Sequence, residues 1–133
     1  MRLCNDNYIL VAPDKLTPTE EINEHRALKL EQAIKACGRW IIPVCVHKHS
    51  LFVMDGHHRL SIAKRLKLER MPVVLLDYTQ VDVCAWRAGE IITPHQIIEM
   101  AKSGNKFPYK TTRHIFKEPL PACDIPLHEL QQE

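Results

Sequence analysis

Apolar residues occur along the chain in two patterns, one typical of strands and the other typical of helices. Short apolar or β-branched runs predict strands at residues 8–12, 40–46, 51–55 and 71–78. Pro43 indicates that the second run is an edge strand or that the strand begins beside the proline. The polar residues 47–50 separate the second run from the third, so these two runs are expected to form a hairpin.

The longest predicted helix covers residues 18–37. Its apolar side chains recur at helical spacing, and Gly38 follows as a stop signal. Thr17 and Glu20 match a capping box at the start of this helix, with a threonine N-cap and a glutamate three residues later. Glu20 therefore has two interpretations. It is either a structural cap or a carboxylate that the helix dipole keeps ionised, suited to orient a hydroxyl and accept its proton.

Two further helices and an irregular C-terminal segment complete the pattern. One helix is expected directly after Gly56, and another after Thr93, which begins a second capping-box signal. Residues 81–89 fit either a strand or a helix. The proline-rich residues 107–133 predict an ordered loop or tail that ends in a helical turn near residues 127–130. The pattern as a whole predicts an α+β fold.

The composition predicts one globular domain. The chain has 133 residues, of which 45% are hydrophobic, and this is enough to bury a core. We expect a single domain over residues 1–133, with a core at about 8–90 and a C-terminal helix and loop segment at about 91–133. The 18 basic and 16 acidic residues leave a net charge of only +2, so the charge does not indicate a nucleic-acid surface.

The cysteines and the N-terminal residues bear on the compartment. Five cysteines without a C-x-x-C pair are typical of reduced thiols rather than of a disulfide framework or a zinc site. The N-terminal residues lack the apolar run of a signal peptide, and no stretch approaches the ~18 apolar residues of a membrane span. We therefore expect a cytoplasmic protein without a membrane partner.

The most informative polar stretch is Asp55-Gly56-His57-His58-Arg59, which stands where an apolar run ends and a helix begins. Asp-Gly is a common turn dipeptide, and a purely structural turn explains that pair by itself. His57, His58 and Arg59, however, place imidazole and guanidinium groups on a first helical turn, where the macrodipole disfavours cations. A bound anion reverses this cost. A phosphate chain fits, because the free N–H groups of the turn and the planar Arg59 fork can both bind it.

Other chemistries fit this stretch less well. Neighbouring helical positions point about 100° apart, so His57 and His58 are poorly placed to share one zinc ion. No Walker loop and no kinase glycine-rich loop occurs, so any nucleotide must be bound by another device. Near the C-terminus, residues 110–114 form either a solvated basic loop or an anion site. In an extended conformation, Lys110, Thr112 and His114 would face one side together, where they could hold a carboxylate or a phosphate.

Taken together, these motifs resemble the ParB/sulfiredoxin fold. The resemblance rests on a strand followed by D-G-H-H-R at the start of a helix, preceded by P-x-E-E near residue 20. Within that fold the chain is most similar to the free L-serine kinases, which make O-phospho-L-serine from serine and a nucleoside phosphate. The resemblance implies a small mixed sheet with helices packed around it, ATP or ADP as the phosphoryl donor, and Mg²⁺. It runs from about residue 10 to residue 78 and resumes at Trp86 and at K-T-T-R-H.

The resemblance also implies roles for individual residues. Glu20 would orient and deprotonate the serine hydroxyl, and Asp55 would help to place Mg²⁺. Asp55, Gly56, His57, His58 and Arg59 would form the phosphate-binding turn, with Asp55 and His58 joining Glu20 as catalytic candidates. Trp86 would border the serine pocket, although a tryptophan is more commonly a core residue. The serine carboxylate and the transferred phosphate would be held by Lys110, Thr112 and His114.

One departure and three alternatives accompany this interpretation. Only residues 90–109 separate Gly89 from Lys110, whereas the free serine kinases carry an extra segment there. Sulfiredoxins use a catalytic cysteine directly before their His-Arg pair, and this chain has His57 at that position, so the thiol mechanism is absent. A ParB-like nucleotide-binding or DNA-partition module remains an alternative, although no helix-turn-helix follows. The third alternative is a non-catalytic nucleotide sensor, or a toxin–antitoxin-type regulatory domain that uses the same turn. Oligomeric state is left open by the sequence.

Overall fold

A computed structural model describes residues 8–131 of the chain. Its centre is a four-stranded mixed sheet in the order β1-β5-β3-β4. Strand β3 runs parallel to β5, whereas the β1–β5 and β3–β4 pairs are antiparallel. These strands are β1 (Ile9–Val11), β3 (Val44–His47), β4 (Val53–Asp55) and β5 (Met71–Leu76).

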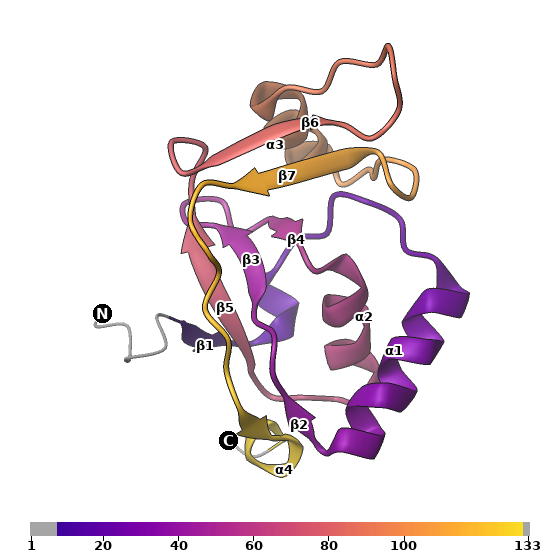
Figure 1. The fold of residues 1–133 in the computed structure, drawn as a ribbon, viewed down its shortest axis with the longest axis vertical. Coiled ribbons are helices and arrows are strands. Elements are labelled where there is room, and N and C mark those ends of the chain that lie inside the picture. Colours follow the sequence, from indigo (N-terminus) through magenta and orange to yellow (C-terminus); the bar gives the residue numbers. More distant parts are fainter. Residues whose placement is uncertain (1–7, 132–133) are drawn as a thin grey trace.

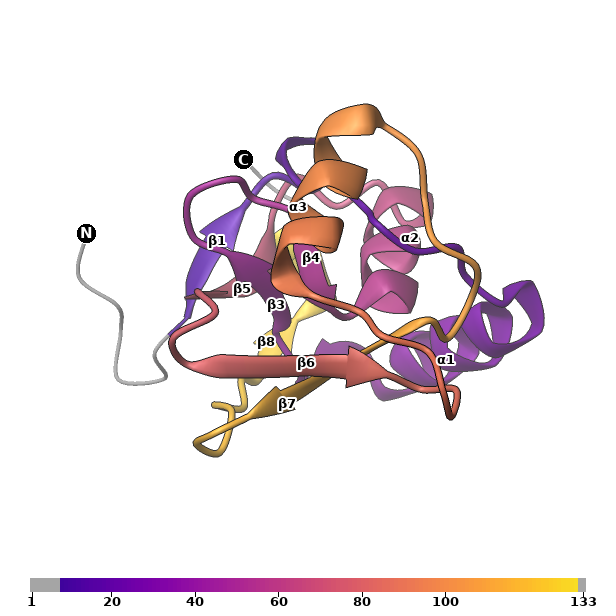
Figure 2. The same cartoon turned by 90° about the horizontal axis from the view of Figure 1, so that it is seen from above.

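The remaining elements pack around this sheet and include two separate two-stranded sheets (Figure 1). Helices α1 and α2 pack against each other beside the sheet. The ribbon of β6 and β7 lies with α3 beyond the end of the sheet that carries β4, and Figure 2 shows the same arrangement from above. The elements are η1 (Pro13–Lys15), α1 (Glu24–Cys37), β2 (Arg39–Trp40), α2 (His57–Arg65), β6 (Val81–Ala85), α3 (Pro94–Ser103), β7 (Thr112–Phe116), β8 (Ile125–Pro126) and α4 (Leu127–Leu130).

The buried side chains form two clusters, one on each side of β3. Because successive strand residues face opposite sides, Val44 and Val46 pack toward α2 while Cys45 packs toward the β6–β7 ribbon. The first cluster includes Ile62 of α2, and the second includes Ile97 of α3. This alternation fixes the register of β3, and with it the position of the β4–α2 turn that follows the hairpin.

The four strands predicted in the first part of the chain are present, with the hairpin at residues 47–50. Strand β3 begins directly after Pro43, and it lies inside the sheet rather than at its edge. The helix after Gly56 is α2. Helix α3 begins as predicted, because the Thr93 side chain accepts from the Gln96 N–H and the Gln96 side chain accepts from the Thr93 N–H.

The predicted start of the long helix is wrong. Helix α1 begins at Glu24, where the Asn23 side chain caps it by accepting the N–H of Arg26. Residues 18–23 are not helical, and tertiary hydrogen bonds use their backbone instead. The N–H of Phe107 donates to the Thr19 carbonyl, and the N–H of Glu21 donates to the Phe107 carbonyl, each over 2.8 Å. Pairing with a distant segment has overridden the local capping signal.

The C-terminal segment contains more regular structure than the sequence predicted. Residues 112–116 form β7, which pairs antiparallel with β6, and residues 125–126 form β8, which pairs with β2. The ambiguous residues 81–89 thus begin with a strand. The predicted last helical turn is α4. Within residues 8–131, no helix combines the length and the apolar character needed to span a membrane.

Candidate active site

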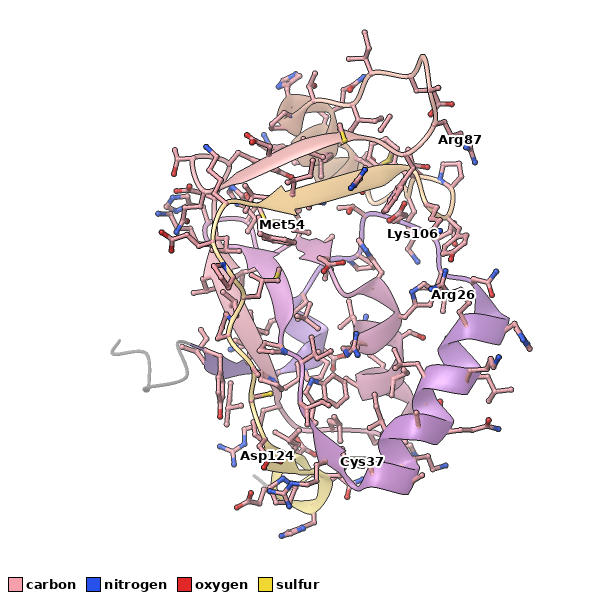
Figure 3. All side chains as sticks on the ribbon, viewed as in Figure 1. Arg26, Cys37, Met54, Arg87, Lys106 and Asp124 are labelled. Atoms are coloured by element: carbon pink, nitrogen blue, oxygen red, sulfur yellow. The ribbon has the colours of Figure 1, made fainter. Side chains whose placement is uncertain are left out.

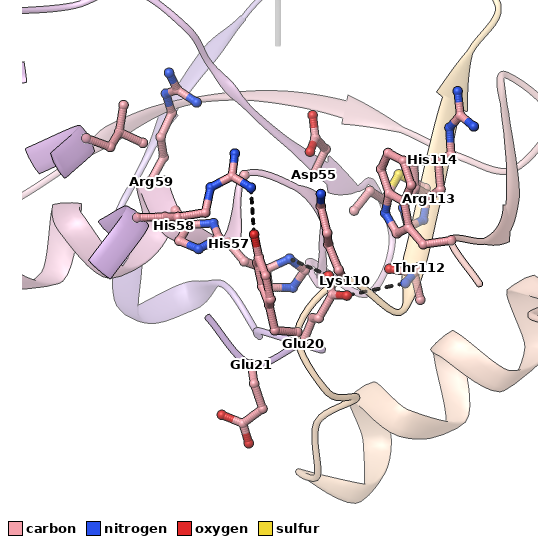
Figure 4. A pocket seen from close by; sticks show the side chains of 16 residues that line it. Glu20, Glu21, Asp55, His57, His58, Arg59, Lys110, Thr112, Arg113 and His114 are labelled. Carbon is pink, nitrogen blue, oxygen red and sulfur yellow. Dashed lines mark hydrogen bonds and ion pairs between the residues drawn. The ribbon is translucent and has the colours of Figure 1, made fainter. Parts of the chain in front are cut away.

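One cavity of about 570 Å³ lies where the β4–α2 turn, the start of α1, the end of β6 and residues 109–114 meet. Figure 4 shows the side chains that line it. Segments distant in sequence supply its walls, so only the folded chain brings them together. All ten residues that the sequence singled out line this cavity, namely Glu20, Asp55, Gly56, His57, His58, Arg59, Trp86, Lys110, Thr112 and His114.

The β4–α2 turn depends on Gly56. This residue is the N-cap of α2 with φ 114° and ψ 27°, a backbone conformation that favours glycine. A Cβ atom here would lie 3.0 Å from a Val44 methyl group and 3.3 Å from the Val44 Cα. No side chain caps α2, so the N–H groups of its first turn are available at the cavity. Such an end of a helix is suited to binding an anion.

The two histidines of the turn accept hydrogen bonds from the backbone of residues 19–23. His57 Nε2 accepts the N–H of Thr19, and His58 Nε2 accepts the N–H of Asn23, both over 3.1 Å. Burial lowers the pKa of His57 to about 3, and burial followed by the charge of Arg26 lowers the pKa of His58. Both rings are therefore neutral near pH 7. The expectation of imidazole cations on this turn is corrected, and Arg59 alone supplies a permanent charge there.

Asp55 and Arg59 face the same cavity and influence each other. Partial desolvation raises the pKa of Asp55, while the charge of Arg59 and the N–H of Gly56 oppose that rise. Desolvation lowers the pKa of Arg59, and Asp55 acts in the opposite direction. A carboxylate and a guanidinium that are both partly desolvated beside a free helix start form a mixed site, suited to a phosphate that carries a cation.

Glu20 is held by the backbone of the segment that leads into β7. Its Oε1 accepts the N–H of Thr111 in a short hydrogen bond and the N–H of Thr112 over 3.3 Å. Its Oε2 lies 3.9 Å from Nδ1 of His57. Burial raises the pKa of Glu20, the two N–H donors lower it, and the charge of Asp55 adds a smaller rise. The capping-box interpretation of Glu20 is wrong, as is the helix dipole as its electrostatic environment, since α1 begins only at Glu24.

Trp86 and the basic residues after Tyr109 form another wall of the cavity. Trp86 is 47% exposed, so it is not a core residue. The Lys110 ammonium lies 5.2 Å and the Arg113 guanidinium 4.9 Å from the centre of its ring. Lys110 has φ 58° and precedes β7, so the expected extended run of three side chains begins only at Thr112. Thr112 and His114 are on the strand itself.

His114 is the most enclosed of the basic residues in this wall. Its Nε2 lies 3.0 Å from the hydroxyl of Tyr78, and its Nδ1 is buried without a hydrogen-bond partner among the described residues. Burial lowers the pKa of His114 to about 4, so the ring is neutral near pH 7. Hydrogen bonding rather than charge is what His114 offers to a ligand.

The chain is similar to known proteins in sequence and in fold, although no family model matches it. An ATP-dependent L-serine kinase from Staphylothermus marinus is 30% identical over 100 residues, which are 71% of this chain and 40% of that protein. A ParB-like protein from Sulfolobus acidocaldarius is 33% identical over 101 residues, covering 69% of this chain and 47% of that protein. The chain thus spans less than half the length of these curated relatives.

Solved structures also match this chain in fold. A free serine kinase in complex with AMP matches with a TM-score of 0.85 over 93% of both chains, at 17% identity. SbnI with a C-terminal truncation, from Staphylococcus aureus, matches with a TM-score of 0.88 over 100% of this chain and 92% of that chain, at 16% identity. The chain has the ParB/sulfiredoxin-like fold. The predicted fold class is confirmed.

Sequence reasoning assigned no site role to three other polar residues that line the cavity, Arg26, Tyr109 and Arg113. Arg26 donates to the hydroxyl of Tyr109 over 2.7 Å, which joins the first turn of α1 to the segment before β7. Figure 3 shows Arg26 on the side of the molecule that also carries Lys106. Arg113 belongs to the basic stretch at residues 110–114, but its contact with the ring of Trp86 arises only in the folded chain. Nothing in the local sequence around Arg26 or Tyr109 indicates their pairing.

The ligands available for a metal in this site are few. The described residues contain no group of three or more His, Cys, Asp or Glu side chains that could hold a metal ion. Mg²⁺ commonly binds through one or two carboxylates together with substrate phosphates and water. Asp55, at the mouth of a phosphate-suited turn, fits that mode, and it would supply one oxygen ligand to an ion carried by a nucleotide.

Proposed function

We propose that this protein is a small-molecule kinase that transfers a phosphoryl group from ATP or ADP to the hydroxyl of free L-serine. The observation that carries the proposal is the placement of Glu20, a buried carboxylate fixed through one oxygen beside a helix start suited to phosphate. The named serine kinase relative and the kinase structure that contains AMP support the same activity.

In the proposed reaction, Glu20 accepts the proton of the serine hydroxyl as the serine oxygen attacks the terminal phosphorus of the nucleotide. The bond between that phosphorus and the bridging oxygen breaks, and ADP or AMP leaves. Because burial raises the pKa of Glu20 from its ordinary value toward neutral pH, the carboxylate is a better base than an exposed glutamate. Two backbone N–H groups bind the charged form and oppose that rise.

Phosphoryl transfer needs positioning and charge stabilisation more than covalent chemistry from the protein. The first-turn N–H groups of α2 and the side chain of Arg59 would bind the phosphates. Asp55 would hold Mg²⁺, which neutralises phosphate charge when bound. Lys110, Thr112 and His114 would bind the serine carboxylate and the transferred phosphate, and Trp86 would close the serine side of the cavity. His58, which accepts the backbone N–H of Asn23, would hold the start of α1 against this side of the cavity.

A second function is favoured by one observation. The relative from Sulfolobus acidocaldarius is a ParB-like protein, and its identity to this chain, 33%, is as high as that of the serine kinase relative. A nucleotide-binding module without kinase activity would keep the phosphate-binding turn and would not depend on Glu20. The two functions therefore differ in what Glu20 does, and the net charge of +2 gives no support to a nucleic-acid partner.

The test is to incubate the purified protein with L-serine and Mg²⁺, and with ATP or ADP in parallel, and to look for O-phosphoserine by mass spectrometry. Glu20→Gln should abolish the product and leave nucleotide binding intact. Glu21→Gln is the matched control, because the neighbouring carboxylate points away from Glu20 in Figure 4. The binding module would be supported instead by two results together. The parent protein would make no phosphoserine with ATP or with ADP, and it would bind a nucleotide that Arg59→Ala does not bind.

A further inference from the structure

The ring of His57 has a defined protein partner at each nitrogen. Nε2 accepts the N–H of Thr19 over 3.1 Å and lies 3.3 Å from the Thr19 hydroxyl, which is itself within 3.3 Å of the Val53 carbonyl. A backbone N–H can only donate, so Nε2 must be the unprotonated nitrogen of the neutral ring. The single ring proton is therefore on Nδ1.

That proton is directed at the base of the proposed reaction. Nδ1 lies 3.9 Å from Oε2 of Glu20, and both side chains are nearly enclosed, at 7% and 12% exposure. The other carboxylate oxygen is already held by the N–H groups of Thr111 and Thr112. Oε2 is thus the oxygen left to meet a substrate hydroxyl, and the Nδ1–H group of His57 is a donor beside it. Figure 4 shows the two side chains facing each other.

We propose that His57 is a positioning residue for Glu20, in which the backbone of Thr19 selects the Nδ1–H tautomer and this N–H orients Oε2 toward the acceptor hydroxyl. The inference rests on the proposed function. It assigns to His57 a task different from phosphate binding, because both ring nitrogens are directed at protein groups. His57 exchanges no proton with the substrate. Its Nδ1–H contact with Oε2 is expected to shorten when the acceptor binds, as catalytic hydrogen bonds commonly do.

Two amide substitutions separate the nitrogens. The amide nitrogen of His57→Asn falls near the position of Nδ1 and keeps a donor toward Glu20. The amide oxygen of His57→Gln reaches the position of Nε2 and keeps an acceptor for Thr19. Removing a hydrogen-bond donor from a charged group costs a free energy that corresponds to about a tenfold change in rate. We therefore expect kcat for phosphoserine formation to fall about tenfold more in His57→Gln than in His57→Asn, while KM for the nucleotide stays similar in both.

Fold stability gives the opposite order, which separates positioning from a structural effect. His57→Gln, which keeps the bond to Thr19, should unfold at higher denaturant concentration than His57→Asn. A lower kcat in the less stable variant, His57→Asn, would overturn the proposal, because activity would then follow folding. Equal kcat values in the two variants would overturn it as well.

A measurement on the unliganded protein decides the contact without any turnover. In ¹⁵N-histidine-labelled protein, long-range ¹H–¹⁵N spectra distinguish the two tautomers, and the loss of one signal set in His57→Asn assigns His57 among the 8 histidines. We expect the Nδ1–H tautomer and a shift of its Nδ1 resonance in Glu20→Gln. An Nε2–H tautomer, or an Nδ1 resonance that does not move, would overturn the inference. If the parent makes no phosphoserine, the proposed kinase function falls, and these spectra still decide whether His57 orients Glu20.

Discussion

Replacing Gly56 by alanine tests whether the phosphate-suited turn depends on a backbone conformation and on a close approach. With φ 114°, a side chain at this position costs about 1–2 kcal/mol in backbone strain. The new Cβ would also lie 3.0 Å from a Val44 methyl group and 3.3 Å from the Val44 Cα. The Cα belongs to a central strand and cannot move as a side-chain end can. Overpacking of this kind adds about 1–3 kcal/mol, so Gly56→Ala should cost about 2–5 kcal/mol of unfolding free energy.

The assay is equilibrium unfolding in urea, with Gly104→Ala as the matched control. Gly104 also has a left-handed backbone, with φ 78°, but a Cβ there would meet no heavy atom within 4 Å. It should therefore lose only the strain contribution. Adding Val44→Ala to Gly56→Ala should not restore stability, because the contact with the Val44 backbone remains and the valine is lost from the core. If Gly56→Ala lost no more stability than Gly104→Ala, the close approach to Val44 would be refuted.

Three other perturbations have defined outcomes. The pKa values of His57 and His114 are about 3 and about 4 in the folded chain and near 6.5 in the unfolded chain, so protons bind the unfolded chain first as the pH falls. The free energy of unfolding should therefore be about 4 kcal/mol lower at pH 5 than well above pH 6.5. Urea unfolding at pH 5 and at pH 8 measures this difference, and an unchanged midpoint would contradict it. Thr93→Ala should lower the unfolding free energy by about 0.5–2 kcal/mol through loss of the α3 cap, and a smaller loss in urea would show that the cap is dispensable. Tyr109→Phe removes the acceptor for Arg26; it should change stability by less than about 1.5 kcal/mol yet raise KM for serine, and an unchanged KM would separate this contact from the acceptor site.

The strands and the later helices could be predicted because their signals are local. The strand ending at Asp55, the turn at Gly56 and the capping box at Thr93 each depend on residues a few positions apart. Strands β7 and β8 could not be predicted in the same way. Strand β8 has only two residues and lies in proline-rich sequence, and each of the two strands is defined by pairing with a strand far away in the chain, β7 with β6 and β8 with β2. Sequence periodicity carries little information about such pairings.

The candidate site was found through residue types, whereas the contacts within it came from the fold. The ten predicted residues all line one cavity, although they come from separate segments. What the sequence could not supply is which atoms face each other. Burial keeps His57 and His58 neutral, and the backbone of Thr19 and Asn23, whose N–H groups these rings accept, lies more than thirty positions earlier. The cation interaction of Arg113 with Trp86 likewise depends on the pairing of β7 with β6.

The error at the start of α1 bears directly on the proposed chemistry. In a capping box the carboxylate of the glutamate accepts a backbone N–H at the start of the helix. The helix dipole would also lower the pKa of this carboxylate and make it a weaker base. In the folded chain residues 18–23 are not helical, so Glu20 does not cap α1, and its carboxylate accepts the N–H groups of residues 111 and 112 instead. Burial raises the pKa of Glu20 while the N–H donors keep its charged form bound. Losing the local cap is therefore what leaves Glu20 one free oxygen beside the phosphate-suited turn, and it is this oxygen that the proposed reaction requires.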